Sequence, residues 1–503
     1  MSRQSFRDLI VYEIYPTSFK DTNHDGVGDL KGITQKLDYI KDSGFNALWL
    51  NPFYKSPFKD GGYDVEDFFA VDPRFGTMDD YRELIREAHK REIRIFIDLV
   101  AGHASFMNED FLKSAEPQRN DKSDLFIWND NPWQPDGEFR FISGMYQRHG
   151  CYMVNFFAHQ PAFNYGFKVV EHPEWQMSYK DERTFAARNY MLDVMRFWLK
   201  EGTAGFRVDM ADSLVKKDDD KKATAEVWRW MFERIRKEYP EAFFVSEWSN
   251  PKQSFDAGFD ADFVLDHWDN FYHRFFRSND TSRGDAVITG KGDMEFALRD
   301  MKERFAEAEK TDSYLALISG NHDTWRIANY LDDKDLRVFY MILFTLPGVP
   351  FVLYGDEIGM KTSDIPSRDG GFQRTGTRIP MIWNCEKPNH GFCDGECIPY
   401  LPFSEDNDMS VNSEMKDEDS LYNFIRKLTQ LRKEIPDLKE PHMDIRNEKR
   451  VLTFTRGRYE LIVNMSNREY VFKGERIMSS AEFKEKLPAH CAVLVYKHVE
   501  KEK

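Results

Sequence analysis

The stretch Gly205-Phe-Arg-Val-Asp209 is a short, mostly apolar run that ends in a carboxylate. Its length fits a buried strand. Residues i and i+2 leave the same face of a strand, so the Arg207 and Asp209 side chains project together. Amphipathic segments with helical periodicity flank the run, at residues 184–201 and 223–238. A strand between two such helices is typical of a parallel sheet covered by helices.

The same alternation continues along the chain. Seven further strand candidates occur at residues 10–15, 47–51, 94–100, 243–247, 262–266, 314–319 and 351–354. Residues 79–91 and 334–346 are among the helical segments between them. Eight strands alternating with helices predict an α/β protein with a closed (β/α)8 barrel. An open doubly wound sheet is the competing fold, but no glycine-rich dinucleotide fingerprint follows the first strand.

Two regions depart from this alternation. Residues 104–174 are rich in Asn, Asp, Pro and aromatics without a long periodic segment, which predicts an inserted, loop-rich subdomain. Residues 420–434 resemble a last barrel helix, and the short alternating runs beyond them predict a small antiparallel β domain. We therefore expect a catalytic barrel at 1–103 and 175–438, the subdomain at 104–174, and a β-sandwich-like domain at 439–503.

The amino-acid composition limits the molecules that the protein could bind. The 503 residues, 41% of them hydrophobic, can bury a large core. A net charge of −16 argues against nucleic acid and anionic membranes as partners. The polar N-terminus does not resemble a signal peptide, and prolines interrupt the longest uncharged run, at 338–355, so it does not resemble a membrane span. We expect a cytoplasmic protein; the oligomeric state stays open, with a monomer favoured.

The five cysteines are an odd number in a long chain, which does not indicate a disulfide framework. Cys385, Cys393 and Cys397 are close in sequence, but no His-containing metal pattern surrounds them. They are expected to be free thiols, with a metal or redox role as the alternative.

Charged and imidazole side chains gather where the predicted strands end. The third strand ends in Asp98-Leu-Val-Ala-Gly-His103, the fourth in Arg207-Val-Asp209, the fifth in Glu247, and the seventh in Asn321-His322-Asp323. Each residue alone fits an ordinary surface charge or ion pair. In a (β/α)8 barrel these ends share one rim, where active sites form. Together they predict an active site.

This set of residues fits glycosidic bond cleavage. A retaining mechanism needs two carboxyl groups about 5–5.5 Å apart, one to attack the anomeric carbon and one to protonate the leaving oxygen. Asp209 and Glu247 stand on neighbouring strands. Arg207 is expected to hold the pKa of Asp209 down and keep it ionised, and a partly desolvated Glu247 suits the acid.

Longer motifs occur in a recognisable order: Val11-Tyr-Glu-Ile-Tyr-Pro16, Gly61-Gly-Tyr-Asp64, the strand ends above, and Leu353-Tyr-Gly-Asp-Glu357. With them, the sequence resembles the α-amylase superfamily of glycoside hydrolases, glycoside hydrolase family 13, over nearly its whole length. Residues 420–433 are similar to the last barrel helix of its α-glucosidase-type members.

The resemblance implies roles for individual residues. Asp209 would be the nucleophile, Glu247 the acid/base, and Asp323 the carboxylate that holds and distorts the sugar. The glucose-binding positions match Asp64, His103, Arg207 and His322, and Tyr63 matches the ring that stacks on the sugar. Arg378 resembles the arginine that pairs with Asp64 in exo-acting members.

A possible metal loop lies near the start of the chain. The segment Asp21-Thr-Asn23-His-Asp25-Gly-Val27-Gly-Asp29 alternates oxygen ligands around a glycine turn, like the first half of an EF-hand loop. The twelfth position is Gly32 rather than Glu. The resemblance implies one structural Ca2+, with Mg2+ possible, bound by the side chains of Asp21, Asn23, Asp25 and Asp29 and the carbonyl of Val27. A plain Asx-rich turn is the alternative.

The sequence departs from the family pattern at three places. Gly102 stands where the family usually has an Asn that binds a second Ca2+, and glycine offers no side-chain oxygen. Ala162 stands where glucosidase-type members commonly have Asp. Met210 follows the nucleophile, whereas α-1,6-specific members tend to have Val there and α-1,4-specific members Ala or Thr. The linkage preference therefore stays open.

Three functions remain for comparison. The favoured one is a retaining exo-type α-glucosidase that acts on maltose, isomaltose or short malto-oligosaccharides through a covalent glucosyl-aspartate intermediate. A transglucosylase or trehalose-synthase-like isomerase would use the same residues, but an acceptor sugar would replace water. A non-catalytic ancillary subunit of an amino-acid transporter would lack the full catalytic set, whereas Asp209, Glu247 and Asp323 are all present here.

Overall fold

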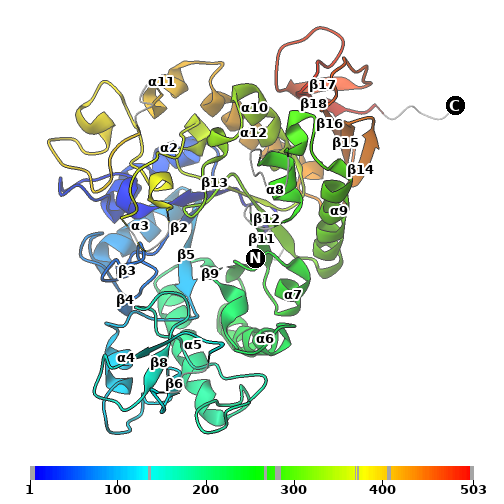
Figure 1. Ribbon diagram of the computed structural model, residues 1–503. Helices are drawn as coiled ribbons and strands as arrows, with labels where there is room; N and C mark the ends of the chain where they lie inside the picture. Colours follow the sequence, from blue (N-terminus) through cyan, green and yellow to red (C-terminus); the bar gives the residue numbers. More distant parts are fainter. Residues whose placement is uncertain are drawn as a thin grey trace.

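The computed structural model describes residues 6–133, 137–265, 269–277, 285–368, 370, 373–404 and 409–498. Eight parallel strands close into a barrel in the order β1-β13-β12-β11-β10-β9-β5-β2 (Figure 1). The strands are β1 (Val11–Ile14), β2 (Ala47–Leu50), β5 (Arg94–Val100), β9 (Gly205–Asp209), β10 (Phe243–Ser246), β11 (Ala261–Val264), β12 (Tyr314–Ile318) and β13 (Val349–Leu353). The predicted (β/α)8 barrel is confirmed. Asp266, the predicted end of the sixth strand, lies outside the described residues.

Helices surround the barrel. They are α1 (Leu30–Gln35), α2 (Leu37–Asp42), α3 (Met78–Lys90), α5 (Phe185–Lys200), α6 (Lys222–Glu238), α7 (Pro251–Asp256), α8 (Phe271–Phe276), α9 (Met294–Thr311), α10 (Asp333–Thr345) and α12 (Leu421–Glu434). α3 shows why these segments fold as they do. Thr77 and Asp80 form a capping box at its start, and Tyr81, Leu84 and Ala88 bury one helical face. Within the described chain, no helix is both long and apolar enough to cross a membrane.

The register of β9 places the charged residues at the rim. β9 lies between β5 and β10, with Arg207 opposite Asp98 on one side and Val245 on the other. The strand is buried along its whole length, as expected where helices cover a parallel sheet. Asp209 ends the strand and pairs with Val100. The Asp98, Arg207 and Asp209 side chains therefore reach the same end of the barrel interior.

Between β5 and α5 the chain forms a small loop-rich unit. It contains α4 (Glu109–Ser114) and a three-stranded antiparallel sheet, in the order β6-β8-β7, of β6 (Trp128–Asn129), β7 (Phe141–Ser143) and β8 (Cys151–Met153). Phe111 lies at its centre and contacts the rings of Phe126, Trp128 and Tyr152. The cyan segment below β5 in Figure 1 is this unit. A smaller hairpin of β3 (Tyr54–Lys55) and β4 (Asp67–Val71) lies nearby.

The C-terminal residues form an antiparallel sheet, as predicted. Its order is β14-β15-β16-β18-β17, comprising β14 (Asp444–Glu448), β15 (Val451–Arg456), β16 (Tyr459–Asn464), β17 (Glu475–Ser479) and β18 (Cys491–Tyr496). Over residues 444–498 this is a single sheet rather than the expected sandwich-like arrangement. α10 covers one face (Figure 1). Loop residues such as Phe472 and Phe483 pack on a small core on the other face, so a second sheet is not needed.

Two buried arginines tie this sheet to the barrel. Arg432 of α12 donates to the carbonyls of Phe344 and Leu346, at 2.8 and 2.9 Å. Arg456 of β15 donates through Nε to the carbonyl of Thr345, at 3.2 Å. The last carbonyls of a helix have no partner within the helix, so the two guanidinium groups cap the buried end of α10.

Two of the five cysteines are not free thiols. Cys393 and Cys397 form a disulfide, whereas Cys151, Cys385 and Cys491 are free. The prediction of free thiols was wrong for this pair. The chain around residues 391–400 folds back against the segment 20–29 and brings the two sulfur atoms together, and the sequence spacing alone does not show this.

Candidate active site

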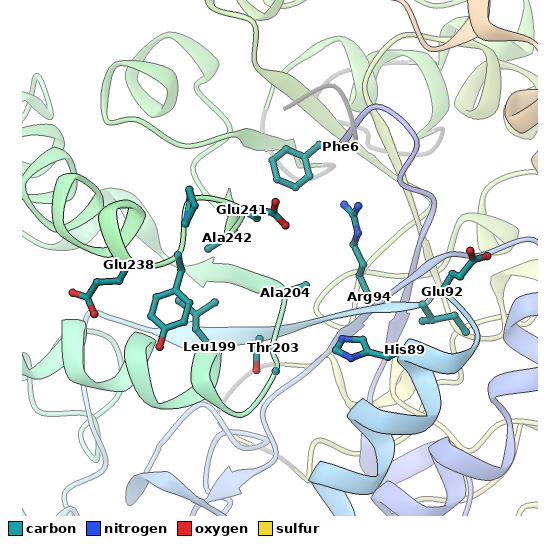
Figure 2. Close-up of a pocket in the computed structure, with 14 residues that line it drawn as sticks. Phe6, His89, Glu92, Arg94, Leu199, Thr203, Ala204, Glu238, Glu241 and Ala242 are labelled. Carbon is teal, nitrogen blue, oxygen red and sulfur yellow. The ribbon is translucent and has the colours of Figure 1, made fainter. Parts of the chain in front are cut away.

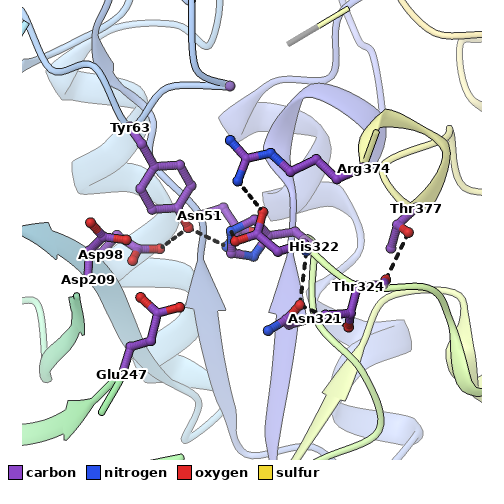
Figure 3. A network of polar contacts seen from close by, with 12 residues as sticks. Asn51, Tyr63, Asp98, Asp209, Glu247, Asn321, His322, Thr324, Arg374 and Thr377 are labelled. Atoms are coloured by element: carbon purple, nitrogen blue, oxygen red, sulfur yellow. Dashed lines mark hydrogen bonds and ion pairs between the residues drawn. The ribbon is translucent and has the colours of Figure 1, made fainter. Parts of the chain in front are cut away.

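The residues at the strand ends line a pocket of about 610 Å³. Its wall includes Asp60, Tyr63, His103, Phe156, Gln160, Asp209, Met210, Glu247, Trp248, Asp323 and Arg374. In Figure 3, Asp98, Asp209 and Glu247 lie on one side of the site, and His322 and Arg374 lie on the other. The structure therefore brings the three predicted catalytic carboxylates, Asp209, Glu247 and Asp323, together in one pocket.

A larger hollow, of about 830 Å³, lies at the opposite end of the barrel (Figure 2). It is lined by Phe6 and by residues at or just before the starts of three strands, such as Arg94, Ala204 and Ala242. Chemistry in (β/α)8 barrels takes place at the carboxyl ends of the strands. The predicted catalytic residues are all absent from this hollow, so it is not the active site.

Arg207 organises the carboxylates. Its Nη1 lies 2.6 Å from Asp98 Oδ1 and 3.1 Å from Asp209 Oδ1, and its Nη2 lies 2.9 Å from Glu247 Oε2. The guanidinium is almost fully buried. Planar, forked donors of this kind fix carboxylates in a defined geometry. Asp209 and Glu247 thus contact one rigid group from neighbouring strands, which holds the two carboxyl groups close together.

The pKa of Asp209 is higher than the sequence led us to expect. Burial, followed by the charge of Glu247, raises the pKa of Asp209 well above its ordinary value, although Arg207 lowers it. Arg207 lowers this pKa as predicted, but burial and Glu247 outweigh it, so the expected net lowering does not occur. Two close carboxyl groups favour sharing one proton. A retaining glycosidase needs one ionised and one protonated carboxyl group.

Met210, next to the nucleophile position, has a left-handed backbone with φ 41°. This conformation is strained for a residue other than glycine. It aims the Met210 N–H at Glu247 Oε2, at 2.9 Å. Glu247 therefore accepts hydrogen bonds from a backbone amide and from Arg207 on the same oxygen, which fixes its orientation beside Asp209.

Asp323 is held by two arginines. Its Oδ1 lies 2.8 Å from Arg374 Nη1 and 2.8 Å from Arg378 Nη2. Burial raises the pKa of Asp323, but the permanent charges of Arg374 and Arg378 outweigh burial and hold this pKa well below its ordinary value. Asp323 is therefore an ionised acceptor at the wall of the pocket, suited to sugar hydroxyls.

The predicted pair of Asp64 and Arg378 is wrong. Asp64 accepts hydrogen bonds from Ser56 Oγ and from the N–H groups of Lys59 and Asp60, at 3.0, 3.0 and 3.1 Å, so it holds its own loop in shape. Arg378 contacts Asp323 and the backbone carbonyl of residue 322.

The acid–arginine pair at the pocket is Asp60 with Arg374. Gly61 and Gly62 both have positive φ, a backbone conformation that glycine adopts readily. Asp60 and Tyr63 line the pocket, whereas Asp64 does not. The true partners stand four residues before the predicted ones, and nothing in the spacing alone distinguishes the two choices.

A family profile described as "Alpha amylase, catalytic domain" matches residues 13–440. The chain belongs to the α-amylase family of glycoside hydrolases. The recognition from sequence and the glycoside hydrolase class are both confirmed.

Several α-amylase family members resemble the chain over most of its length. "Trehalose synthase/amylase TreS" of Mycolicibacterium smegmatis is 31% identical over 85% of this chain and 76% of its own length. "Glucan 1,6-alpha-glucosidase" of Streptococcus pneumoniae is 29% identical over 93% of each chain. The crystal structure of an α-amylase from H. orenii has a TM-score of 0.77 and 26% identity, over 97% of this chain and 99% of that chain.

His322 and Tyr63 form the floor of this α-amylase-family site. Their rings stack with centroids 5.2 Å apart and planes within 8°. His322 Nδ1 lies 2.7 Å from Glu13 Oε1 and 3.1 Å from Asn51 Nδ2. Burial lowers the pKa of His322 well below its ordinary value and raises that of Glu13 well above its own. The ring is therefore neutral, and its Nδ1 accepts from Glu13, while Asn51 Nδ2 donates to Glu13 Oε1 at 3.2 Å.

The other ring nitrogen of His322 faces the pocket wall. Nε2 lies 3.5 Å from Asp323 Oδ2 and makes no hydrogen bond within the described residues. With Nδ1 accepting, Nε2 carries the proton and is a donor for a sugar hydroxyl. The sequence analysis missed Glu13, Asn51, Asp60 and Arg374. A polar residue inside an otherwise apolar strand, such as Glu13 in Val11–Ile14, is the signal that could have identified the first of them.

His103 lies where the inserted unit meets the barrel. Its Nε2 is 3.0 Å from the carbonyl of Tyr63, and its Nδ1 is 3.2 Å from Asn155 Nδ2. Burial lowers the pKa of His103 to about 3, so the ring is neutral. It lines the pocket and holds the backbone of Tyr63, which adds a structural part to its predicted role in binding sugar.

The predicted metal loop forms a compact turn. Asp21 Oδ1 accepts from the N–H groups of Asn23 and His24, at 3.0 and 2.7 Å. Asp29 caps α1 through a 2.7 Å bond from the N–H of Gly32. Burial raises the pKa of Asp29, and the like charge of Asp21 adds to this rise. The carbonyl of Val27 accepts no hydrogen bond within the described chain.

Proposed function

We propose that the protein is a retaining exo-acting α-glucosidase. The single observation that carries the proposal is the contact of Asp209 and Glu247 with one buried guanidinium, that of Arg207, at 3.1 and 2.9 Å. Relatives named oligo-1,6-glucosidase, from Saccharomyces cerevisiae and Parageobacillus thermoglucosidasius, support an α-glucosidase.

In the proposed reaction, Asp209 attacks the anomeric carbon while Glu247 gives a proton to the leaving glycosidic oxygen. The product is a covalent glucosyl-aspartate. Glu247 then takes a proton from water, and the hydroxide formed attacks the same carbon and releases Asp209. Asp323 and His322 hold the hydroxyls of the same glucose. Hydrogen bonds of this kind strengthen as charge develops in the transition state.

Exo action follows from how the pocket is closed. Arg374 contacts both Asp60 and Asp323. Gln160 of the inserted unit, which is fully buried, donates to Asp60 at 2.6 Å. These contacts link the inserted unit to the barrel loops at the pocket. In the proposal they form a wall that leaves room for one terminal glucose and excludes a continuing glucan chain.

A trehalose-synthase-like isomerase is the second candidate. It is favoured by the 31% identity to the relative named trehalose synthase/amylase. Phe156 and Trp248 line the pocket, and aromatic rings suit a second sugar because they offer large apolar faces. A sugar held there would attack the glucosyl-aspartate in place of water.

The test is a product profile with maltose, isomaltose, trehalose, sucrose and maltotetraose, followed by proton NMR. Glucose released first as the α anomer supports a retaining hydrolase. Glucose released first as the β anomer would exclude double displacement. A new disaccharide as the main product would favour the isomerase.

We also propose that the loop from Asp21 to Asp29 binds one structural Ca2+, with Mg2+ as the possible substitute. Carboxylate, carboxamide and carbonyl oxygens are the ligands that Ca2+ prefers. Two observations support the fit: the adjacent like charges of the buried Asp21 and Asp29, and the unengaged carbonyl of Val27. The ion would stabilise the loop and supply no acid or base. We also propose that the protein is a monomer, the state favoured in the sequence analysis.

A further inference from the structure

Two segments far apart in sequence meet beside the predicted metal loop. The N–H of Asp21 donates to the carbonyl of Phe392 at 2.9 Å, and the N–H of Tyr400 donates to the carbonyl of Gly26 at 2.8 Å. Lys20 Nζ lies 3.0 Å from Asp394 Oδ1. The segment 391–400 is thus fixed against residues 20–29 by backbone and side-chain contacts.

Potential metal ligands converge at this contact. One carboxylate oxygen of Asp21 and the sulfur atoms of Cys393 and Cys397 all lie within 4.8 Å of one another. No other group of three His, Cys, Asp or Glu residues in the described chain is as close. Asp21 and Cys393 are buried, and Cys397 is partly exposed, so the site is enclosed but accessible to solvent.

A fourth ligand stands close by. The ring of His24 lies against Gly395, which is two residues from each cysteine; a Cβ atom at Gly395 would be 3.2 Å from His24 Nδ1. His24 is exposed. Two thiolates, a carboxylate and an imidazole or a water are the donors that tetrahedral Zn2+ uses in proteins.

We propose that Asp21, Cys393 and Cys397 form a binding site for a thiophilic divalent cation, Zn2+, when the two cysteines are reduced. The disulfide masks this site in the oxidised chain. This site shares Asp21 with the Ca2+ site proposed above but differs in its other ligands, because sulfur ligands select Zn2+ and oxygen ligands select Ca2+. It does not depend on the glucosidase activity.

Reduction converts the disulfide form of the site into the dithiol form that binds metal. A thiol reductant attacks one sulfur of the disulfide, and exchange with a second thiol releases Cys393 and Cys397 as two thiols while the reductant becomes a disulfide. Each cysteine then loses one proton when its thiolate binds Zn2+. A reducing cytoplasm, the location predicted from the sequence, keeps most cysteines as thiols.

The experiment uses the full chain, with and without reduction by a phosphine, which is then removed. Titration with Co2+ reports thiolate ligands through charge-transfer absorption in the near ultraviolet, and Zn2+ displaces the Co2+. We expect the reduced chain to bind one equivalent and the oxidised chain to show no such absorption. Before reduction three thiols should titrate in the unfolded chain, namely Cys151, Cys385 and Cys491, and after reduction all five.

Variants identify the ligands. Cys393→Ser and Cys397→Ser should each bind Zn2+ at least about tenfold more weakly than the reduced parent. Cys385→Ser, at an exposed free cysteine, is the matched control and should bind like the parent. Asn23→Ala removes a predicted Ca2+ ligand but no member of the sulfur site, so its cobalt spectrum should be unchanged. Retained hydrolysis of an α-glucoside shows that each variant is folded.

Three results would overturn the proposal. One is a reduced parent without thiolate-to-cobalt absorption. Another is a Cys393→Ser variant with the same absorption and affinity as the parent. The third is an oxidised chain that binds Zn2+ as tightly as the reduced one.

Discussion

Glu13 Oε1 lies 2.7 Å from Nδ1 of His322, below the floor of the pocket. The carboxyl group is fully buried, and burial raises its pKa well above the ordinary value. Glu13 therefore keeps its proton and donates it to Nδ1. This leaves the Nε2 proton of His322 on the side of Asp323, so a residue of the first strand sets the tautomer of this ring.

Replacement of Glu13 tests this relationship. Glu13→Gln keeps a donor for Nδ1 and should leave kcat/KM within about threefold of the parent. Glu13→Leu removes the donor, and loss of one buried hydrogen bond of about 1–3 kcal/mol corresponds to a decrease in kcat/KM of about 5–150-fold. Steady-state kinetics on the best substrate measure both. Equal losses in the two variants would show that the hydrogen bond to His322 is not what matters.

Asp209→Asn and Glu247→Gln should each lower kcat by several orders of magnitude, because each removes an obligatory step. The isosteric side chains should leave the fold intact, and thermal unfolding followed by circular dichroism checks this. Asp212→Asn is the control: Asp212 also lines the pocket but pairs with Lys221. A turnover close to that of the parent in either catalytic variant would refute the assignment.

Arg374→Ala should open the closed end of the pocket. The change removes the contacts to Asp60 and Asp323, and loss of a charged contact of about 2–3 kcal/mol lowers kcat/KM on maltose by roughly 30–150-fold. The variant should also begin to cleave maltotetraose at internal bonds, which chromatography of early products detects. Arg368→Ala, at an exposed arginine outside the pocket wall, should behave like the parent. An unchanged product pattern in Arg374→Ala would argue against the wall.

The buried Glu357 should make stability depend on pH. It accepts hydrogen bonds from Tyr12 and Tyr39, at 2.5 and 2.7 Å, and burial raises its pKa from 4.5 to about 7. A carboxyl group whose pKa is higher in the folded state stabilises the protein most at low pH. Its contribution is lost as the pH rises from about 4.5 to about 7, a change of about 3 kcal/mol.

Glu357→Gln has no proton to lose and keeps an acceptor for both tyrosines. Between pH 4.5 and 7 the free energy of unfolding should therefore fall by about 3 kcal/mol more in the parent than in the variant. Urea denaturation at the two pH values measures this difference. Parallel pH dependence in the two proteins would mean that Glu357 ionises in the folded state as it does in the unfolded chain.

Removal of Ca2+ by a chelator should lower Tm by several degrees, because a bound ion stabilises only the folded loop. Addition of Ca2+ should restore Tm. Asp25→Asn should remove this dependence, since Asp25 is an exposed member of the predicted ligand set. Asp79→Asn, at an exposed carboxylate on α3, is the control. A Tm that is insensitive to the chelator in the parent would favour the plain Asx-rich turn.

The barrel and the carboxylates at its rim were predictable, because apolar runs of strand length alternate with helical patterns and charged residues stand at or just after the ends of four of the runs. The choice between Asp60 and Asp64 was not predictable. It depends on two positive-φ glycines that direct the chain within one turn. The raised pKa of Asp209 depends on burial, which no motif reports. The disulfide depends on how residues 391–400 fold back on the chain. The C-terminal residues form a single sheet because α10 packs on one face of it.

The guanidinium groups of Arg432 and Arg456, buried at the end of α10, decide how the molecule can be divided. A shortened chain that stops after α12 would lose one of them and uncover the apolar side of α10. The barrel should therefore not be stable when it is excised or fused to another protein without the C-terminal sheet. The last strands stabilise the barrel although they contribute no residue to the active site.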